Sequence, residues 1–596
     1  MKKIIHNIKN VIYLLKPYWR YGKLYMILSF LMSVIIWPLN NILNVYFHKT
    51  VLDSIIEGQN FINILFIIAF FEFFIFFIPL IQGIVYTLYF HIQQQKIMMN
   101  INRDIFVKSV KTDYKYFDNT EFYNNYTMTI AQYSQQSSQA SMFLAQLLSS
   151  VTTMIAMTSI IAATDLWILV ITVITLAAST VVGNINNKTM FKNFEELNKE
   201  DRRLFYIQRM FYSNYYAADI KSTNVKDYLF DNYDNSVKNK FNILKKYAFK
   251  MIGFGQIQSF MRQGLNFIIV AYVAYKIVHG EITVGNFAGM IAASASLQNS
   301  LGMFFNFINQ ADQMSIYTDK MKSFLELKSE IEDPPQSDIL LSRIPEGPFN
   351  IEIKNVNFAY ENSKFALKDI NIKINKGEKI AIVGENGGGK STLTKLLLRL
   401  YDVSSGEILI NGEPIKNYDI NKLRRSIGIA FQNTNLYALT LSENMQLYHK
   451  IPDEKLYEVI DKVGLNPVLE KSKNGLNTQL TKEFDNEGIF LSGGETQRMG
   501  LSRIFSGEFG LLLLDEPSAA LDPLAEYKLN KIIFDRQSKT TTIIISHRLS
   551  TVRDADCIYL IDNGIISESG THGQLMSKQG KYYEMFTKQA ENYIKS

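Results

Sequence analysis

The sequence predicts a membrane protein of two parts. An all-helical part with six membrane spans and long cytoplasmic extensions comes first, and an α/β domain built on a phosphate-binding loop follows. Three observations predict this architecture. Long apolar stretches are concentrated in the first half of the 596-residue chain. Short Ile/Val/Leu strands alternate with helical segments after Phe349. A glycine-rich loop joins one of these strands to a helix.

Residues 1–22 are expected to form a basic amphipathic helix on the membrane surface. Ile4, Ile8, Val11 and Leu15 recur at helical spacing among lysines and an arginine. No small-residue cleavage site follows, so this segment is not expected to be a cleaved signal peptide.

Residues 23–325 form the expected membrane domain. About 20 helical residues cross a ~30 Å hydrocarbon core, and six stretches are long and apolar enough: Leu24–Val45, Phe61–Tyr89, Phe143–Ala163, Leu166–Val182, Ile252–Val278 and Ile282–Ile308. The short loops near residues 54–60, 164–165 and 279–281 lack Lys and Arg, whereas the longer segments on the other side are rich in them. Basic loops stay in the cytoplasm, so both ends of this domain are expected to face inward, in the cell membrane.

The two basic segments, residues 91–140 and 188–250, are too long for turns. Their apolar positions lie three to four apart with few Pro or Gly, which is typical of helical extensions into the cytoplasm. Each contains a run that mixes aromatic and acidic residues, Tyr116–Tyr123 and Tyr215–Ile220. Either run suits a docking surface, and either one alone suits an ordinary amphipathic turn.

Residues 326–348 are expected to be a linker, because Pro334 and Pro335 break the helix there. Residues 349–596 are expected to fold around a mostly parallel sheet that includes Ile380–Val383, Leu511–Leu514 and Thr542–Ile545. The single cysteine, Cys557, excludes a disulfide within the chain and suits a buried strand. The net charge of +6 is spread along the chain, which argues against a nucleic-acid partner.

A phosphate loop follows the strand that ends at Val383. It reads Gly384, Glu385, Asn386, Gly387, Gly388, Gly389, Lys390, Ser391 and Thr392, the pattern G-x-x-x-x-G-K-[ST] followed by a helix. Glycines let backbone N–H groups converge on phosphate at a positive helix end. Lys390 is expected to reach the β- and γ-phosphates of a nucleotide, and the Ser391 hydroxyl to bind Mg²⁺. An accidental glycine-rich turn is the alternative, and the strand–loop–helix setting argues against it.

Three further groups complete the candidate chemistry. Asp515 and Glu516 end an apolar strand as adjacent acids, where Asp515 suits the metal and Glu516 suits activation of water. His547 follows another strand and suits a sensor of the γ-phosphate, although a core histidine is the usual reading. Gln432 offers an amide that could touch Mg²⁺ or water.

A second anion site is expected where Ser492, Gly493, Gly494 and Glu495 open a helix. One nucleotide needs one phosphate loop, so this second site suggests that two chains clamp one ATP.

These motifs together resemble the ATP-binding cassette transporters of the exporter type, a P-loop NTPase cassette fused behind a six-helix transmembrane domain. The resemblance implies that Tyr360 stacks on adenine and that Asp522 lies in the loop following the acidic strand, beside the residues above. It also implies that the runs near residues 117–123 and 215–220 are coupling helices. Gly388 and Glu495 depart from the family, which usually has a small Ser, Ala or Cys and a Gln there; the first departure is expected to loosen the loop slightly.

The function that this resemblance implies is export of a small molecule, lipid or peptide, driven by ATP and Mg²⁺ in a dimer of half-transporters. A homodimer is favoured because every catalytic position is intact, and a heterodimer stays open. Glu72, Gln298 and Asn299 are candidates for the substrate cavity, with helix pairing as the alternative for Glu72. An ATP-gated channel, a regulatory membrane subunit and an importer on the same architecture are the alternative functions.

Overall fold

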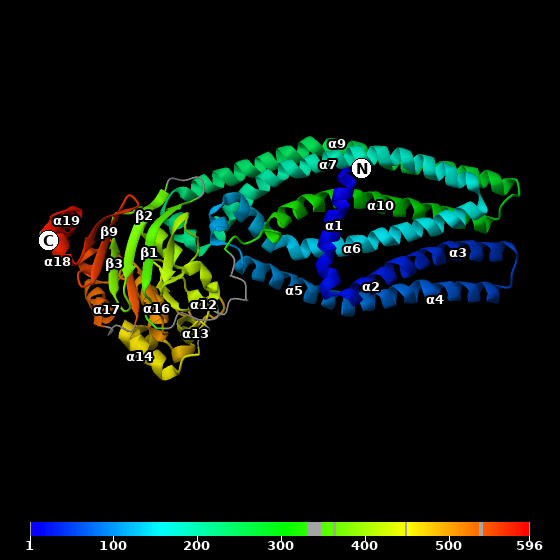
Figure 1. Ribbon diagram of the computed structural model, residues 1–596. Helices are drawn as coiled ribbons and strands as arrows, with labels where there is room; N and C mark the ends of the chain where they lie inside the picture. The colour runs from blue at the N-terminus through cyan, green and yellow to red at the C-terminus, as the bar shows by residue number, and fades with distance from the viewer. Residues whose placement is uncertain (1, 332–346, 361–364, 448–449, 536–539, 595–596) are drawn as a thin grey trace. The chain divides into compact units, whose positions relative to one another are not determined.

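The computed structural model describes residues 2–331, 347–360, 365–447, 450–535 and 540–594. The chain divides into two compact units (Figure 1). Unit 1 comprises Met1–Lys111 with Thr120–Leu327, and unit 2 comprises Thr112–Asn119 with Lys328–Ser596. A short piece of the N-terminal half therefore folds with the C-terminal half.

Unit 1 consists of long helices. After α1 (Lys2–Tyr21) they are α2 (Lys23–Leu31), η1 (Met32–Ile36), α3 (Trp37–Ile56), α4 (Phe61–Val85), η2 (Tyr86–Phe90), α5 (His91–Val110), α6 (Thr120–Thr164), α7 (Leu166–Tyr212), η4 (Asn214–Tyr216), α8 (Ala217–Ser222), α9 (Val225–Val278) and α10 (Val284–Leu325). Helix α2 continues into α3 through the π-helical turn η1, and α4 continues into α5 through η2. Pro38 lies two residues after the end of η1 and cannot donate an intrahelical hydrogen bond, which suits a locally widened turn.

The predicted spans all fall on these helices, but their number is not confirmed. Among the described residues, three helices are long and apolar enough to cross a membrane: Lys23–Ile56, Phe61–Val110 and Thr120–Thr164. The other three expected spans lie within α7, α9 and α10, which mix apolar stretches with many polar residues.

The two basic segments are helical, as predicted. Helices α5 and α6 extend beyond the first pair of spans, and α7 and α9 extend beyond the second pair and lie side by side (Figure 1). A 3₁₀ turn, η3 (Tyr114–Asp118), lies between α5 and α6, and η4 with α8 lies between α7 and α9.

Helix α1 forms as predicted, but its buried face differs from the expected one. It packs across α6 and α10 (Figure 1) and buries Val11, Leu14 and Tyr18 in the apolar core of unit 1. Ile8 is 43% exposed, and the side chain of Ile4 lies outside the described residues. The reason is a polar contact: Asn10 Nδ2 donates to Ser315 Oγ at 2.7 Å and Asp319 Oδ1 at 2.8 Å, which turns the face with Asn10 toward α10.

Unit 2 contains two sheets. A six-stranded sheet has the order β10-β9-β3-β8-β7-β6, formed by β10 (Ile565–Gly570), β9 (Cys557–Asp562), β3 (Lys379–Val383), β8 (Thr541–Ile545), β7 (Leu511–Asp515) and β6 (Ile427–Ala430). Only the pairing of β10 with β9 is antiparallel in this sheet. The mostly parallel sheet is thereby confirmed.

The second sheet is antiparallel and has the order β2-β1-β4-β5, from β2 (Phe365–Ile374), β1 (Ile351–Ala359), β4 (Ser405–Ile410) and β5 (Glu413–Pro414). The described helices and 3₁₀ turns around the sheets are α11 (Lys390–Leu397), η6 (Ile415–Asn417), α12 (Ile420–Arg425), α13 (Leu441–Gln446), α14 (Asp453–Val463), α15 (Asn466–Lys471), η7 (Gly475–Asn477), α16 (Gly493–Ser506), α17 (Pro523–Asp535), η8 (Leu549–Val552), α18 (His572–Lys578) and α19 (Lys581–Ile594).

The parallel sheet gathers the candidate residues at one edge. Parallel strands place their carboxyl ends together. The phosphate loop follows β3, and Gln432 follows β6. Asp515 ends β7 with Glu516 directly after it, and His547 follows β8. The strands themselves are buried, so the core fixes where each loop begins.

Candidate nucleotide-binding site

The phosphate loop closes between β3 and α11 with glycine at its tightest point. Gly389 has a φ of +107° and forms the N-cap of α11. A Cβ atom there would lie 2.8 Å from the carbonyl oxygen of Ala366, so a larger residue would clash. The loop therefore presents backbone N–H groups at a helix N-terminus, which is an anion site.

Lys390 is folded into this loop. Its Nζ donates to the carbonyl oxygens of Gly384 and Glu385, each at 2.8 Å. The side chain is buried, and this burial lowers the pKa of Lys390. A buried ammonium that donates to backbone carbonyls gains from a direct anionic partner, which a nucleotide phosphate would supply.

The backbone contacts around Gly388 explain why the loop accepts the smallest residue at this position. Its N–H donates to the Glu385 carbonyl at 3.2 Å, and its own carbonyl accepts from Gly564 N at 3.2 Å. A Cβ atom would lie 3.1 Å from the oxygen of Glu385 and 3.2 Å from that of Ile561. These contacts hold the loop closed around Gly388.

The acidic pair at the end of β7 has an unusual backbone. Glu516 has a φ of +49°, the left-handed region that non-glycine residues seldom occupy. Burial raises the pKa of Asp515, and the negative charge of Glu516 raises it further. Two adjacent carboxylates in this position favour a cation between them and the phosphates.

The structure brings three of the predicted catalytic residues into direct contact. Gln432 Nε2 donates to Glu516 Oε2 at 2.7 Å, and His547 Nδ1 lies 2.8 Å from Glu516 Oε1. The Glu516 side chain is 11% exposed while that of His547 is 47% exposed. The carboxylate is therefore held at both oxygens from two neighbouring loops.

The residues expected to hold Mg²⁺ fit the ion by their chemistry. Ser391 is exposed in the first turn of α11. Asp515 lies at the end of β7, and the pKa of its carboxyl is raised. A hydroxyl, a carboxylate and the Gln432 amide are the hard oxygen ligands that Mg²⁺ prefers, with room left for phosphate and water.

The residues expected to form a second anion site open a helix, and their binding of an anion stays a prediction. Ser492 is the N-cap of α16, with Ser492 Oγ accepting from Glu495 N at 3.3 Å and Ser492 N donating to Glu495 Oε2 at 2.8 Å. Asp522 caps α17 in the same way by accepting from Ala525 N at 2.9 Å. Within the described parts of this single chain, no hydrogen bond or ion pair joins Ser492, Gly493 or Gly494 to the phosphate loop.

An aromatic cluster surrounds Tyr360, the residue expected to stack on adenine. Its hydroxyl lies 3.1 Å from Thr392 Oγ1, and its ring centroid lies 5.4 Å from that of Tyr401. Lys395 Nζ of α11 lies 5.3–5.7 Å from the ring centroids of Tyr114, Tyr360 and Tyr401. This packing links the residue expected to stack on adenine to α11, the helix that follows the phosphate loop.

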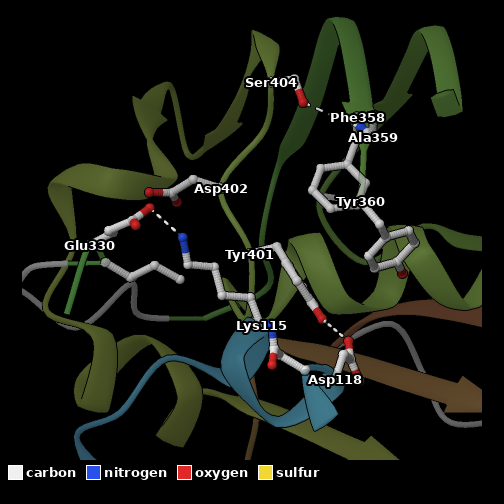
Figure 2. Close-up of a pocket in the computed structure, with 11 residues that line it drawn as sticks. Lys115, Asp118, Glu330, Phe358, Ala359, Tyr360, Tyr401, Asp402 and Ser404 are labelled. Atoms are coloured by element: carbon white, nitrogen blue, oxygen red, sulfur yellow. Dashed lines mark hydrogen bonds and ion pairs between the residues drawn. The ribbon is translucent and has the colours of Figure 1, made fainter. Parts of the chain in front are cut away.

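A cavity of about 580 Å³ adjoins this cluster within unit 2. Figure 2 shows Lys115 and Asp118 of the η3 segment on one side and Tyr360 on the other, with the Tyr401 hydroxyl directed at Asp118. The η3 segment thus packs beside the position expected for the nucleotide base. The sequence pattern of this segment did not predict that packing.

Two glutamines that the sequence interpretation missed support the catalytic loops. Gln497 Nε2 donates to the Glu516 carbonyl at 2.9 Å, and its Oε1 accepts from Ala520 N at 2.8 Å. Gln589 Nε2 donates to the His547 carbonyl at 2.7 Å, and its Oε1 accepts from Leu549 N at 2.9 Å. The role of Gln497 could have been predicted from the sequence, because it is a polar residue on the inner face of α16. Gln589 lies far along the chain, and no sequence pattern indicates its role.

The three cavity candidates in unit 1 differ in their exposure. Gln298 is 9% exposed and its Nε2 donates to Asn266 Oδ1 at 3.0 Å, which joins α10 to α9. Asn299, one position further, is exposed. Glu72 is exposed on α4, a helix with no buried residue. Gln298 thus takes part in helix packing in this chain, and its expected role in a substrate cavity stays a prediction.

Several known proteins are similar to this chain in sequence. Residues 367–519 match the family model described as ABC transporter. The subtilin transport ATP-binding protein of Bacillus subtilis is 31% identical over 509 residues, which cover 84% of this chain and 81% of that protein. The mitochondrial iron-sulfur clusters transporter of Saccharomyces cerevisiae is 32% identical over 62% of this chain and 54% of its own.

The fold is also shared with a solved structure. A bacterial Atm1-family ABC exporter with ATP bound superimposes with a TM-score of 0.80 at 21% identity, over 95% of this chain and 98% of that one. The chain belongs to the ABC transporter family and joins, in one polypeptide, the helical membrane part and the ATPase cassette of an exporter.

Proposed function

We propose that this chain is a half-transporter that exports a small molecule, lipid or peptide across the cell membrane by alternating access, using ATP hydrolysis in a dimer. The observation that carries the proposal is the contact of Glu516 with Gln432 and His547 beside the phosphate loop. A chain that only bound ATP would not need a carboxylate held at both oxygens next to that loop.

The residues support a specific division of labour in hydrolysis. Glu516 accepts a proton from the attacking water, and His547 and Gln432 hold its carboxylate in place for this. Lys390 leaves the carbonyls of Gly384 and Glu385 and pairs with the β- and γ-phosphates. Ser391, Asp515 and Gln432 would hold Mg²⁺, which neutralises phosphate charge when bound.

A second chain completes the nucleotide site in this proposal. The N-terminus of α16 is capped by its own Ser492 and Glu495 and makes no bond with the phosphate loop of the same chain. Such a positive helix end suits the phosphates of an ATP bound to a partner cassette. Because the catalytic residues are all present, two identical chains suffice, and a heterodimer is the alternative.

The η3 segment supports the proposed coupling of hydrolysis to the membrane helices. Its Asp118 accepts a hydrogen bond from Tyr401, its Lys115 pairs with Glu330 at 2.5 Å, and its Tyr114 packs on Tyr401 with ring centroids 5.9 Å apart. A shift of the aromatic cluster on nucleotide binding would move this segment and the ends of α5 and α6 to which it is joined. The other expected coupling segment carries Tyr215, which is 82% exposed and open to a partner.

The relatives and the residues of this chain indicate only a broad class of transported substrate. Relatives are named for subtilin, for iron-sulfur clusters and, at 34% identity over 53% of this chain, for lipid A-core. Exposed Glu72 lies on the aromatic helix α4 among Phe70, Phe71, Phe73 and Phe74, which suits an amphipathic or cationic cargo. The basic loops of the membrane domain favour a cytoplasmic position for the cassette.

Vesicle reconstitution tests the function. The wild type should hydrolyse ATP and accumulate a cargo against its gradient, whereas Glu516→Gln should bind ATP with similar affinity and hydrolyse it about 10²–10⁴-fold more slowly. Glu72→Gln is the cavity probe in the same assay, and a cationic cargo should be transported less well. Near-normal turnover in Glu516→Gln would refute the catalytic assignment. ATP-dependent ion current without uphill transport would favour the channel, and accumulation in the opposite direction would favour the importer.

A further inference from the structure

Helix α1 has two apolar faces, and unit 1 covers only one of them. The face with Val11, Leu14 and Tyr18 is buried against α6 and α10. Ile5, Ile8, Ile12 and Trp19 lie along another face and are 43–55% exposed. Their spacing of three, four and seven residues aligns them on one side of the helix. A side chain as large as Trp19 in this position calls for an apolar neighbour.

A groove runs beside this exposed face. It has a volume of about 770 Å³ and lies among α1, α2 and α6, with Ile12, Trp19, Ile27, Phe30, Leu144 and Leu148 in its wall. This volume is within the usual range of sites for organic ligands. The wall is apolar over nearly its whole area, which suits a hydrocarbon chain.

Lys16 is the charged residue in the wall of the groove. Its Nζ lies 5.2 Å from the Tyr13 ring centroid, and within the described part of the chain it forms no ion pair with an acid. Helix α1 contributes five basic residues, Lys2, Lys3, Lys9, Lys16 and Arg20, and no acidic one. The opening of the groove is therefore suited to an anion.

We propose that the groove binds an anionic phospholipid, with one acyl chain lying along Trp19 and Phe30 and the phosphate at Lys16. This groove lies in unit 1, whereas the candidate nucleotide-binding site lies in unit 2. A tryptophan and a lysine one helical turn apart match the arrangement at a membrane–water interface, where the ring contacts the acyl region and the ammonium reaches the headgroup. A second copy of this face would bring like charges of α1 together, which opposes its use as a symmetric dimer contact.

Tryptophan fluorescence gives a direct test because the chain has three tryptophans. Trp37→Phe with Trp167→Phe leaves Trp19 as the only one. This protein is placed in nanodiscs that contain either brominated phosphatidylglycerol or brominated phosphatidylcholine at the same fraction, and quenching of Trp19 is measured. One lysine near an anionic headgroup predicts a roughly fivefold preference for the anionic lipid. Lys16→Gln should remove most of this preference, and Ala145→Phe, which fills the groove, should weaken quenching by the anionic lipid.

Lys9→Gln is the matched control. It removes one charge from the same helix at an exposed position outside the groove, so the preference for the anionic lipid should persist. Equal quenching by both lipids would mean ordinary bilayer contact and would overturn the proposal. Absence of quenching by either lipid would mean that protein covers the groove, which also overturns it. Native mass spectrometry of the wild type and Lys16→Gln provides a second measurement, in which the wild type alone should retain phosphatidylglycerol.

Discussion

Glu516 is held in an unfavourable backbone conformation by the residues proposed to support its role in hydrolysis. A non-glycine residue with positive φ costs on the order of 1–3 kcal/mol unless its surroundings fix it. Its N–H donates to Ile545 O at 2.9 Å and its carbonyl accepts from Gln497, while Gln432 and His547 hold the side chain. This backbone conformation therefore goes together with a carboxylate held between Gln432 and His547, the position that the proposed hydrolysis requires.

Gln497→Leu is predicted to slow hydrolysis without weakening ATP binding. The substitution leaves the Glu516 carbonyl and the Ala520 N–H without their partner, and unpaired buried groups of this kind cost about 1–3 kcal/mol each. A displacement on the order of 1 Å at a catalytic group can cost about 10²-fold in rate, so kcat should fall about 10- to 100-fold with KM for ATP little changed. Steady-state ATPase assays measure both constants.

Gln574→Leu is a suitable control for this prediction. Gln574 Oε1 accepts from Thr571 N at 2.9 Å, so the variant also removes an amide-to-backbone bond, but on α18 outside the catalytic cluster. Its kcat should stay close to that of the wild type. A wild-type kcat in Gln497→Leu would show that Gln497 does not position Glu516.

At the level of single elements, helix α16 carries a titratable cap. The pKa of Glu495 is lowered chiefly by the hydrogen bond from the Ser492 backbone N–H, with Lys471 contributing at 3.5 Å. A carboxyl whose folded-state pKa is depressed stabilises the fold above its ordinary pKa, and this stabilisation is lost as the pH falls through the folded-state pKa.

Glu495→Gln is therefore predicted to alter the acid sensitivity of the cassette. The amide can still accept from Ser492 N but does not titrate, so the difference in Tm between wild type and variant should be constant above about pH 5 and should shrink as the pH is lowered from the ordinary glutamate pKa of 4.5 to about 2.5. A cap of this kind is worth about 0.5–2 kcal/mol, and each kcal/mol corresponds to about 2–4 °C in a domain of this size. Thermal unfolding across this pH range provides the measurement, with Glu495→Ala as a control that is less stable throughout. A difference in Tm that does not change with pH would contradict the prediction.

The elements that the sequence predicted well are those encoded locally. The phosphate loop and the start of α16 depend on residues next to one another, so their patterns predict both the turn and its chemistry. The buried face of α1 could not be predicted, because helical spacing gives its apolar positions but not the partner of Asn10, which lies 305 residues away at Ser315. The contacts of Gln589 and Tyr401 could not be predicted for the same reason, because their partners lie in distant segments of the chain.

At the scale of the whole molecule, one short segment connects the two compact units through the chain itself. Thr112–Asn119 folds with unit 2 but is joined covalently to α5 and α6 of unit 1. Buried Asp113 accepts from Ser329 and, at 2.7 Å, from Glu330 N, so the residues that follow α10 are bound to the same segment. Three long helices therefore lead into a region of unit 2 that also contains Tyr401 and Tyr360.

Tyr401→Phe and Asp118→Ala are predicted to separate hydrolysis from movement of the membrane helices. Phenylalanine keeps the ring contacts of Tyr401 with Tyr360 and Tyr114 but loses the hydrogen bond to Asp118. Because neither change touches Glu516, Gln432 or His547, ATP hydrolysis should stay within about threefold of the wild type, the range expected from losing one hydrogen bond worth about 0.5 kcal/mol outside the site.

Spin-label distances test this uncoupling. In a Cys557→Ser background, a cysteine at exposed Glu57 places one label per chain in the turn between α3 and α4, and a dimer then gives one distance. Trapping with ATP and vanadate should shift this distance in the parent protein and shift it much less in Tyr401→Phe, because the η3 segment no longer follows the aromatic cluster. Tyr418→Phe is the matched control, since that hydroxyl donates to Ile410 O at 2.8 Å within the cassette. An unchanged shift in Tyr401→Phe would mean that nucleotide binding reaches the membrane helices by another contact, such as the exposed Tyr215 segment.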